Sequence, residues 1–236
     1  CFKNNLSTQG VHTYFNNIQI PAPQTIFEDV KKFRPAHWLL LDSEGKGEEK
    51  PYWHVDCTKK TNLSLEDAKE QLNTLMLDSV KKTVVSDVPL GLLLSGGVDS
   101  SLLLALANKI GIKDLTTFTV GNDSINATDD EYKRAQKIAK QFNSNNHSHG
   151  FGDTGFYELI EAAKLCDEPI GILEIFYQFD IYKKINGHAK IVLTGNGADE
   201  IFGGYITYNK LKNFSEYTRL FSYLIQNSNS FLTSTA

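Results

Sequence analysis

Short, largely apolar runs alternate along much of the chain with longer stretches whose apolar residues recur at helical spacing. Runs of this kind are typical of strands that are buried on both faces of a parallel sheet. They lie at residues 90–94, 115–120 and 190–194. Helical patterns lie at residues 102–107, 129–142, 156–165 and 173–185. Strands that alternate with helices predict an α/β fold around a parallel sheet.

The first sixty residues follow a different pattern. The two prolines of Ile20-Pro21-Ala22-Pro23 block a helix, because each removes a backbone donor and fixes φ. Residues 37–41 predict a strand, residues 43–48 a polar turn, and residues 52–55 a short partner strand. We expect this region to be an extended connector with a hairpin and no core of its own.

A longer helix is predicted to begin at Ser64. Ser64-Leu65-Glu66-Asp67 resembles a capping box, with Asp in the place of the usual Glu. Apolar residues then recur at helical spacing and predict a face packed on the core. These residues are Leu65, Ala68, Leu72, Leu75, Met76 and Val80.

Composition narrows the class of protein. The 236 residues include 24 Lys and Arg against 28 Asp and Glu, so the formal net charge is −4. A chain that is 41% hydrophobic fits a globular protein, and its acidic balance argues against nucleic-acid binding. No apolar run reaches the length of a membrane span, and the start does not resemble a signal peptide. Three widely spaced cysteines indicate neither a zinc ribbon nor a disulfide scaffold, and a cytoplasmic location is expected.

The segment Ser95-Gly96-Gly97-Val98-Asp99-Ser100 joins a predicted strand to a predicted helix. Two glycines allow backbone amides to approach an anion closely, and the helix start adds unpaired amides and a positive dipole end. The carboxylate of Asp99 would repel a phosphate unless Mg²⁺ lay between them. The alternative is an ordinary strand-to-helix turn with an Asp near the start of the helix.

A second glycine-rich segment, residues 195–204, follows the last predicted strand. Ligands of parallel α/β sheets bind beyond the carboxyl ends of the strands. Two glycine-rich loops at such ends predict one shared ligand site at that edge of the sheet.

These motifs together resemble a known family. Residues 95–100 match the pyrophosphate loop of the ATP-pyrophosphatase superfamily, and the surrounding motifs resemble the synthetase domain of glutamine-hydrolysing asparagine synthetases. The surrounding motifs are residues 88–94, 118–121, 167–169 and 197–205. Residues 21–27 and 52–53 resemble the stretch that links the glutaminase and synthetase domains of that family.

The resemblance implies a nucleotide-binding domain of the adenine nucleotide alpha hydrolase-like type. Residues 1–60 would be a connector and the end of a glutaminase-like domain, residues 61–225 a truncated ATP-binding domain, and residues 226–236 a polar tail. Asp99 and Asp199 would hold Mg²⁺ against the phosphates and are the expected catalytic residues. The residues expected to contact ATP are Leu94, Ser95, Gly96, Gly97, Asp99, Ser100, Val120, Gly121, Thr194 and Gly195.

The implied reaction is attack of a substrate carboxylate on the α-phosphorus of ATP, which gives an acyl-adenylate and pyrophosphate. Ammonia then displaces AMP and forms an amide, with aspartate as the default acceptor. The ammonia is expected from a glutaminase domain outside this chain, and a homodimer is among the expected assemblies. One alternative is an amidotransferase or cyclising synthetase that acts on another carboxylate. Another is a nucleotide-binding piece without catalytic activity.

The sequence departs from the family at three places. Asn196 stands where the family usually carries an acid, so the identity of the acceptor stays open. The chain stops before the helical region that supplies a catalytic Lys in the family. Cys1 precedes Phe2-Lys3 rather than Gly-Ile, so it is not expected to be a nucleophile.

Three further candidates carry weaker signals. His147 and His149 alternate, which more often marks a strand surface than a metal site. Asp167-Glu168-Pro169 is either an acidic pair near the acceptor or the end of a helix. Tyr205 and Tyr208 are expected to pack under the second loop rather than to line the cleft.

Overall fold

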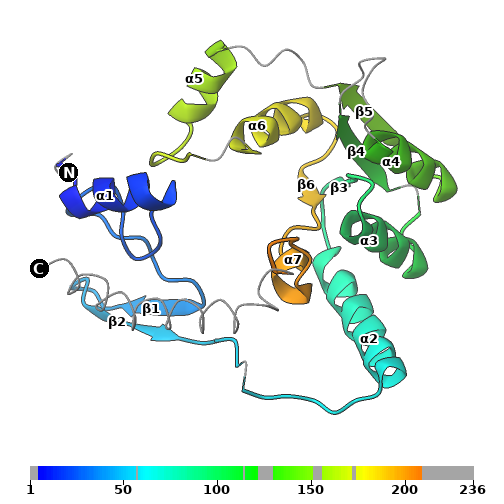
Figure 1. The fold of residues 1–236 in the computed structure, drawn as a ribbon, viewed down its shortest axis with the longest axis horizontal. Helices are drawn as coiled ribbons and strands as arrows, with labels where there is room; N and C mark the ends of the chain where they lie inside the picture. The colour runs from blue at the N-terminus through cyan, green and yellow to red at the C-terminus, as the bar shows by residue number, and fades with distance from the viewer. Residues whose placement is uncertain are drawn as a thin grey trace, which may run out of the picture.

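A four-stranded parallel sheet forms the centre of the chain (Figure 1). The computed structural model describes residues 5–56, 58–113, 115–121, 130–150, 156–171 and 174–208. The strands lie in the order β5–β4–β3–β6. Their bounds are Leu90–Leu93 for β3, Thr116–Gly121 for β4, Asn146–Gly150 for β5 and Ile191–Leu193 for β6. The predicted α/β class and the three apolar strands are confirmed.

Strand β5 is stabilised differently from the other three strands, because its sequence, Asn-His-Ser-His-Gly, contains no apolar run. Its first residue, Asn146, bonds to polar side chains of the neighbouring strand instead. Asn146 donates from Nδ2 to Thr117 Oγ1 at 2.8 Å and to Thr119 Oγ1 at 2.9 Å. Cross-strand polar pairs of this kind stabilise a sheet without apolar side chains.

Helices alternate with these strands, as the pattern predicted. Helix α3 (Val98–Lys109) follows β3 and α4 (Asp130–Gln141) follows β4, and each contacts the strand before it. Helices α5 (Phe156–Lys164) and α6 (Glu174–Ile185) come between β5 and β6, and the short α7 (Ala198–Phe202) follows β6. In Figure 1, α6 lies on the side of β6 away from α3 and α4.

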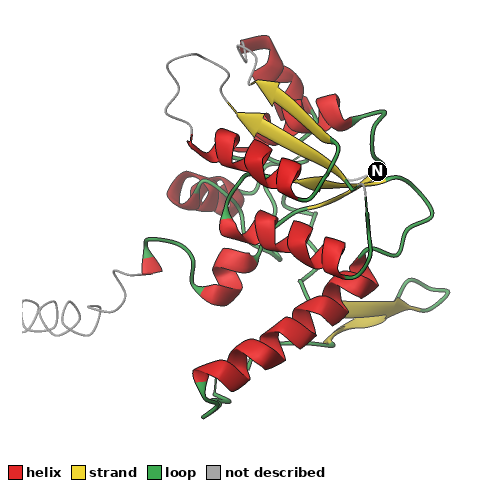
Figure 2. Cartoon of the chain, turned by 90° about the vertical axis from the view of Figure 1, so that its right-hand side faces the viewer, coloured by secondary structure: helices red, strands yellow, loops and turns green. Residues whose placement is uncertain are grey.

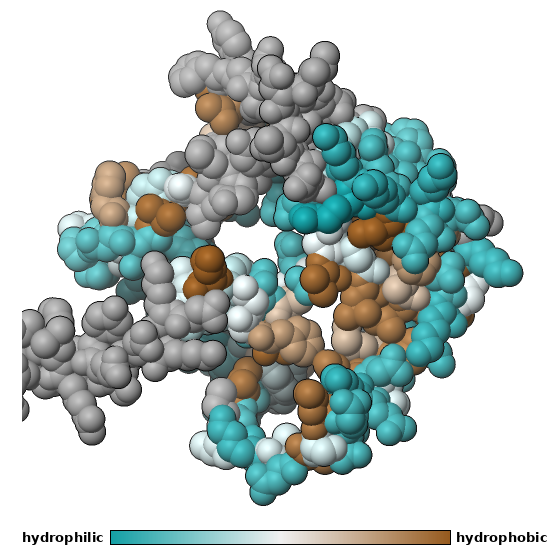
Figure 3. Space-filling model, turned by 45° about the vertical axis from the view of Figure 1, so that its right-hand side comes forward, coloured by the Kyte–Doolittle hydropathy of each residue, from teal (hydrophilic) through white to brown (hydrophobic). Residues whose placement is uncertain are grey.

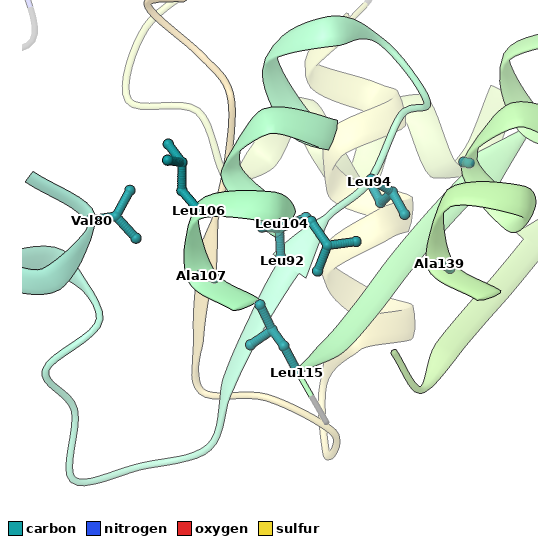
Figure 4. Packing of buried hydrophobic residues seen from close by; sticks show 9 residues of the cluster. Val80, Leu92, Leu94, Leu104, Leu106, Ala107, Leu115 and Ala139 are labelled. Atoms are coloured by element: carbon teal, nitrogen blue, oxygen red, sulfur yellow. The ribbon is translucent and has the colours of Figure 1, made fainter. Parts of the chain in front are cut away.

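The main core lies between the sheet and helices α2 to α4 (Figure 4). Leu92 and Ala107 are fully buried in it, and Leu104 is 2% exposed. The other buried members are Val80, Leu94, Leu106, Leu115, Ala135 and Ala139. This core fixes β3 against α3, so it also fixes the loop that joins them.

Helix α2 (Leu65–Thr83) begins as predicted at Ser64, whose Oγ accepts a hydrogen bond from the Asp67 amide at 3.1 Å. The prediction of a packed apolar face is wrong for residues 65–75, because Leu65 is 69% and Leu75 66% exposed. Only the second half, with Val80 buried, contacts the core. The reason is length, because α2 has 19 residues and the partner helix α3 has 12. Figure 2 shows α2 projecting beyond the sheet.

The hairpin contains the predicted first strand, β1 (His37–Leu41), but the second strand was placed too late. Strand β2 is Gly47–Pro51, paired antiparallel with β1, and residues 52–55 follow it. The turn is tight because Asp42 Oδ1 accepts hydrogen bonds from the amides of Glu44 and Lys46 at 2.9 and 2.8 Å. Pairing therefore starts at Gly47.

The region before the hairpin is more ordered than an extended connector. Helix α1 (Thr8–Asn17), which the pattern did not predict, is capped by Ser7. The chain after α1 lies against the loop that follows α5, where the Gly171 amide donates to the Ile18 carbonyl at 2.9 Å and Lys32 pairs with Glu168. Ile20 and Ile26 are buried there, so the stretch has a small apolar centre.

Some sequence candidates lie outside the described residues. These are Cys1, Cys57 and the tail at 226–236. Among the helices that the structure describes, none combines the length and apolarity needed to cross a bilayer.

Candidate functional site

The order in which strands are added to the sheet reverses at β3. Strand β4 lies on one side of β3 and the last strand, β6, lies on the other. The connections leaving β3 and β6 therefore diverge, and such a switch point opens a crevice beyond the carboxyl ends of the strands. Both glycine-rich loops begin there, as the sequence predicted.

A cavity of about 490 Å³ occupies this crevice. The two loops contribute most of its lining: Leu94, Ser95, Gly97, Asp99, Ser100, Thr194, Gly195, Asn196, Gly197, Asp199, Glu200 and Tyr205. Leu93, Phe118 and Ile181 add apolar side chains. Figure 3 shows apolar residues gathered in the middle of one face of the molecule and hydrophilic residues along its outer rim.

Gly96 fits a position that no other residue could occupy without strain. Its φ of +81° lies in the left-handed region, which disfavours side chains. A Cβ atom there would collide with the carbonyl oxygen of Glu131 and lie 2.8 Å from the amide nitrogen of Ala135. The loop after β3 is therefore pressed directly against the first turns of α4.

The serines of this loop bond to one another. The amide of Ser95 donates to Ser100 Oγ at 3.2 Å, and the two hydroxyl oxygens lie 3.0 Å apart. The amide of Gly97 donates to Ser95 Oγ in a longer bond of 3.3 Å. Ser100 is only 5% exposed, so its hydroxyl stabilises the loop from the buried side.

Helix α3 begins at this loop and presents its N-terminus to the cavity. Its N-cap residue is Gly97, which has no side chain to occupy the amides of the first turn. Those amides and the helix dipole favour a bound anion. Asp99 lies in the same first turn and lines the cavity.

The second loop brings another carboxylate to the cavity. Gly204 lies so close to Asp199 that a Cβ atom there would overlap Oδ1 and lie 3.0 Å from Cγ. The Gly204 amide also donates to the Asp199 carbonyl at 3.0 Å. Asp199 is therefore held by the backbone of its own loop, on the same cavity as Asp99.

Tyr205 lines the cavity and is 44% exposed, so the expectation that it packs under the loop is wrong. Its hydroxyl donates to Glu200 Oε1 at 2.7 Å. This hydrogen bond raises the pKa of Tyr205 to about 12 and lowers the pKa of Glu200. Tyr208 contacts the ring of Tyr205 edge-on, with 5.5 Å between centroids.

One predicted nucleotide residue, Gly96, faces the backbone of Glu131 and Ala135. Val120 and Gly121 lie at the end of β4. The side chain of Val120 is outside the described part of the structure. Ile181 and Glu200 also line the cavity and were not predicted. No sequence pattern marks Ile181, because only the fold brings α6 to this edge.

The other candidates have identifiable surroundings. His147 stacks on Phe118 with 5.6 Å between centroids and lies 4.3 Å from the ring of His188. Glu168 pairs with Lys32 from the region before the hairpin, away from the cavity. Within the described ranges, no three His, Cys, Asp or Glu side chains are grouped to hold a metal. An ion at the cavity would therefore have the two aspartates and oxygens from the ligand, a set that suits Mg²⁺.

The chain is similar in sequence to asparagine synthetases of known organisms. Two relatives are asparagine synthetase B (glutamine-hydrolysing) of Escherichia coli, 30% identical over 219 residues, and asparagine synthetase (glutamine-hydrolysing) 3 of Bacillus subtilis, 31% identical over 193 residues. These matches cover 84% and 76% of this chain but only 38% and 31% of the relatives. The chain thus spans well under half the length of either relative.

Solved structures similar to this chain include an NMN synthetase from Francisella tularensis and an NH3-dependent NAD synthetase from Campylobacter jejuni. Their TM-scores are 0.39 and 0.38, with 20% and 15% sequence identity. Each match covers 61% of this chain, and 60% and 61% of the respective structures. The model of the asparagine synthase family matches residues 71–235, which is more than half of the chain. The chain therefore belongs to the asparagine synthase family.

Proposed function

We propose that the cavity between the two loops binds ATP with Mg²⁺, and that the protein uses it to form an amide through an acyl-adenylate. The observation that carries this proposal is the contact between the loops, which brings Asp99, Asp199 and the start of α3 to one cavity. Residues 61–225 would form the ATP-binding part, and residues 1–60 the connector before it.

The cradle fits a pyrophosphate group. Gly96 and Gly97 leave room for backbone amides, and the first turn of α3 supplies further donors. The 3.3 Å bond from the Gly97 amide to Ser95 Oγ is long, so an anion could replace it at little cost. Ser95, Gly96, Gly97 and Ser100 would surround the phosphates, and Leu94, Val120, Gly121, Thr194 and Gly195 would approach the nucleoside.

Asp99 and Asp199 would hold the metal that neutralises the phosphates. Mg²⁺ is usually bound by one or two carboxylates together with phosphate oxygens and water, and Asp99 and Asp199 both line this cavity. When bound, the ion supplies charge neutralisation on the leaving pyrophosphate. The protein contributes mainly position and electrostatic stabilisation, as in other phosphoryl and nucleotidyl transfers.

The proposed reaction is the one that the resemblance to the family implies. An oxygen of the acceptor carboxylate attacks the α-phosphorus, and the bond to pyrophosphate breaks. The nitrogen of ammonia then attacks the acyl carbon, AMP leaves, and an amide remains. Aspartate is the proposed acceptor, with glutamine or ammonia as the nitrogen source.

A second acceptor class is favoured by Asn196. Its side chain is exposed on the cavity, where the family usually has an acid. An amide donates and accepts hydrogen bonds but carries no charge, so it would tolerate a different carboxylate from the one that an acid selects.

Two measurements test the proposal. Titration of this chain with Mg·ATP should show saturable binding, which EDTA removes. The intact protein should exchange labelled pyrophosphate into ATP only when its carboxylate substrate is present. A panel of aspartate and larger carboxylates then distinguishes the acceptors. If no carboxylate, aspartate included, supports exchange, the adenylation proposal is overturned.

A further inference from the structure

We propose that Thr119 is a positioning residue for the phosphate-binding loop, acting through the peptide group that joins Leu94 to Ser95. Thr119 lies in β4, is 1% exposed, and donates from Oγ1 to the carbonyl oxygen of Leu94 at 3.1 Å. This inference rests on the proposed function, because it concerns the loop assigned to the phosphates.

The Leu94–Ser95 peptide is held from both ends. Its carbonyl accepts the hydrogen bond from Thr119, and its amide, on Ser95, donates to Ser100 Oγ at 3.2 Å. A peptide group is a rigid plane, so two side-chain bonds on opposite edges fix its orientation. It lies one peptide before the amide of Gly96, so its orientation fixes the direction in which the chain enters the glycine loop.

Asn146 sets the direction of the Thr119 hydroxyl. Its Nδ2 donates to Thr119 Oγ1 at 2.9 Å, so the single hydroxyl proton of Thr119 is left for the Leu94 carbonyl. The same amide donates to Thr117 Oγ1 at 2.8 Å. The edge strand β5 thus supports the loop after β3 through one buried threonine.

Apolar burial alone does not account for a threonine at this position. Its neighbours in the core, Leu92 and Leu94, are apolar, and a buried hydroxyl is costly unless it is hydrogen-bonded. Valine has nearly the same shape and would fill the space without that cost. The hydroxyl is useful because it reaches the backbone at the point where the strand ends and the loop begins.

Thr117 provides a matched control. It lies on the same face of the same strand, is fully buried, and also accepts from Asn146. Its hydroxyl lies 3.0 Å from Ser144 Oγ rather than bonding the loop. Thr117→Val should therefore lower stability about as much as Thr119→Val, while leaving the loop unchanged.

The test compares Thr119→Val, Thr117→Val and Thr119→Ser in the full chain. Amide hydrogen exchange of residues 95–100 without ligand should accelerate roughly tenfold in Thr119→Val, the ratio expected for one lost hydrogen bond. The dissociation constant for Mg·ATP should rise by a similar factor. Thr119→Ser keeps the hydroxyl, so both properties should stay within about twofold of the wild type, as they should in Thr117→Val.

The outcomes separate the two proposals. Equal effects of Thr119→Val and Thr117→Val on exchange would show that Thr119 only stabilises the fold, and would overturn the inference. Unchanged exchange in Thr119→Val would overturn it as well. A wild-type chain that binds no Mg·ATP would overturn the proposed function, and the exchange measurement alone would then decide whether Thr119 positions the loop.

Discussion

Gly195 lies against Asp99, so close that a Cβ atom on the glycine would be 3.1 Å from the Cβ of the aspartate and 3.2 Å from the amide nitrogen of Ser100. These two residues belong to loops nearly a hundred positions apart in the sequence. Their contact joins the two loops on one side of the cavity.

Gly195→Ala should weaken Mg·ATP binding about tenfold, because the new methyl group pushes the second loop away from α3. The expected cost in unfolding free energy is about 1–2 kcal/mol. Titration calorimetry and urea denaturation measure the two effects. Gly187→Ala is the control, because Gly187 has a φ of +93° and open space around it, so alanine there costs stability without touching the cavity. Equal ATP affinities in the two variants would contradict the prediction.

Asp99→Asn should weaken Mg·ATP binding far more than it changes stability, since the proposed role of this carboxylate is to hold the metal. The apparent affinity for Mg²⁺ at fixed ATP should fall at least about tenfold. Asp78→Asn removes the same charge from the exposed surface of α2 and should leave the affinity unchanged. Normal Mg·ATP binding by Asp99→Asn would mean that the metal assignment is wrong.

Tyr205 should titrate later than an ordinary tyrosine. Its pKa is raised to about 12 by the hydrogen bond to Glu200, so tyrosinate absorbance should show a late component that disappears in Tyr205→Phe. Because the folded pKa lies above the unfolded value, the stability from this bond is complete below about pH 10 and is lost between pH 10 and 12. The pKa of Glu200 is lowered by the same bond, so its contribution to stability is complete above the usual pKa of a glutamate. That contribution is lost as the pH falls through the lowered pKa.

Glu200→Gln is the decisive variant for this pair. It removes the negative charge that holds the phenol protonated, so the late component should move toward the pKa of an ordinary tyrosine, about 10. Tyr208→Phe keeps the hydrogen bond and should leave the late component in place. A late component that persists in Glu200→Gln would assign the raised pKa to another cause.

Lys32→Met should lower the free energy of unfolding by about 1–2 kcal/mol, less than for a fully buried pair because Lys32 is partly exposed. The substitution leaves the carboxylate of Glu168 without its partner, and its side chain is only 16% exposed. Glu168→Gln added to Lys32→Met removes the uncompensated charge and should restore part of the stability. Denaturation of both variants tests this, and a double variant less stable than Lys32→Met would contradict it.

The residues that could be predicted from the sequence are those whose local pattern has one physical solution. The apolar run at 90–94 is too short for a helix and is bounded by Pro89 and a glycine loop, so it favours a buried strand. Strand β5 could not be predicted in this way, because Asn146 is stabilised by Thr117 and Thr119 on another strand. The apolar residues at the start of α2 recur at helical spacing, which predicts burial. They are exposed because the neighbouring helix α3 is too short to reach them.

The same distinction holds at the site. Asp99 was singled out from the glycine-rich loop that contains it, and Asp199 from the family resemblance; both line the cavity. The position of Tyr205 was predicted wrongly, since burial of a ring depends on how the second loop turns at Gly203 and Gly204. The role of Thr119 depends on a hydrogen bond across two strands, which no sequence motif reports.

Gly96 has a mechanical consequence beyond its backbone angle. Its α-carbon rests on the backbone of Glu131 and Ala135, so the loop and the beginning of α4 form one solid body. A ligand that draws the loop outward must carry this end of the helix with it or open a void behind the glycine. A pull on the loop at the cavity would therefore reach the beginning of α4, on the far side of Gly96 from the cavity.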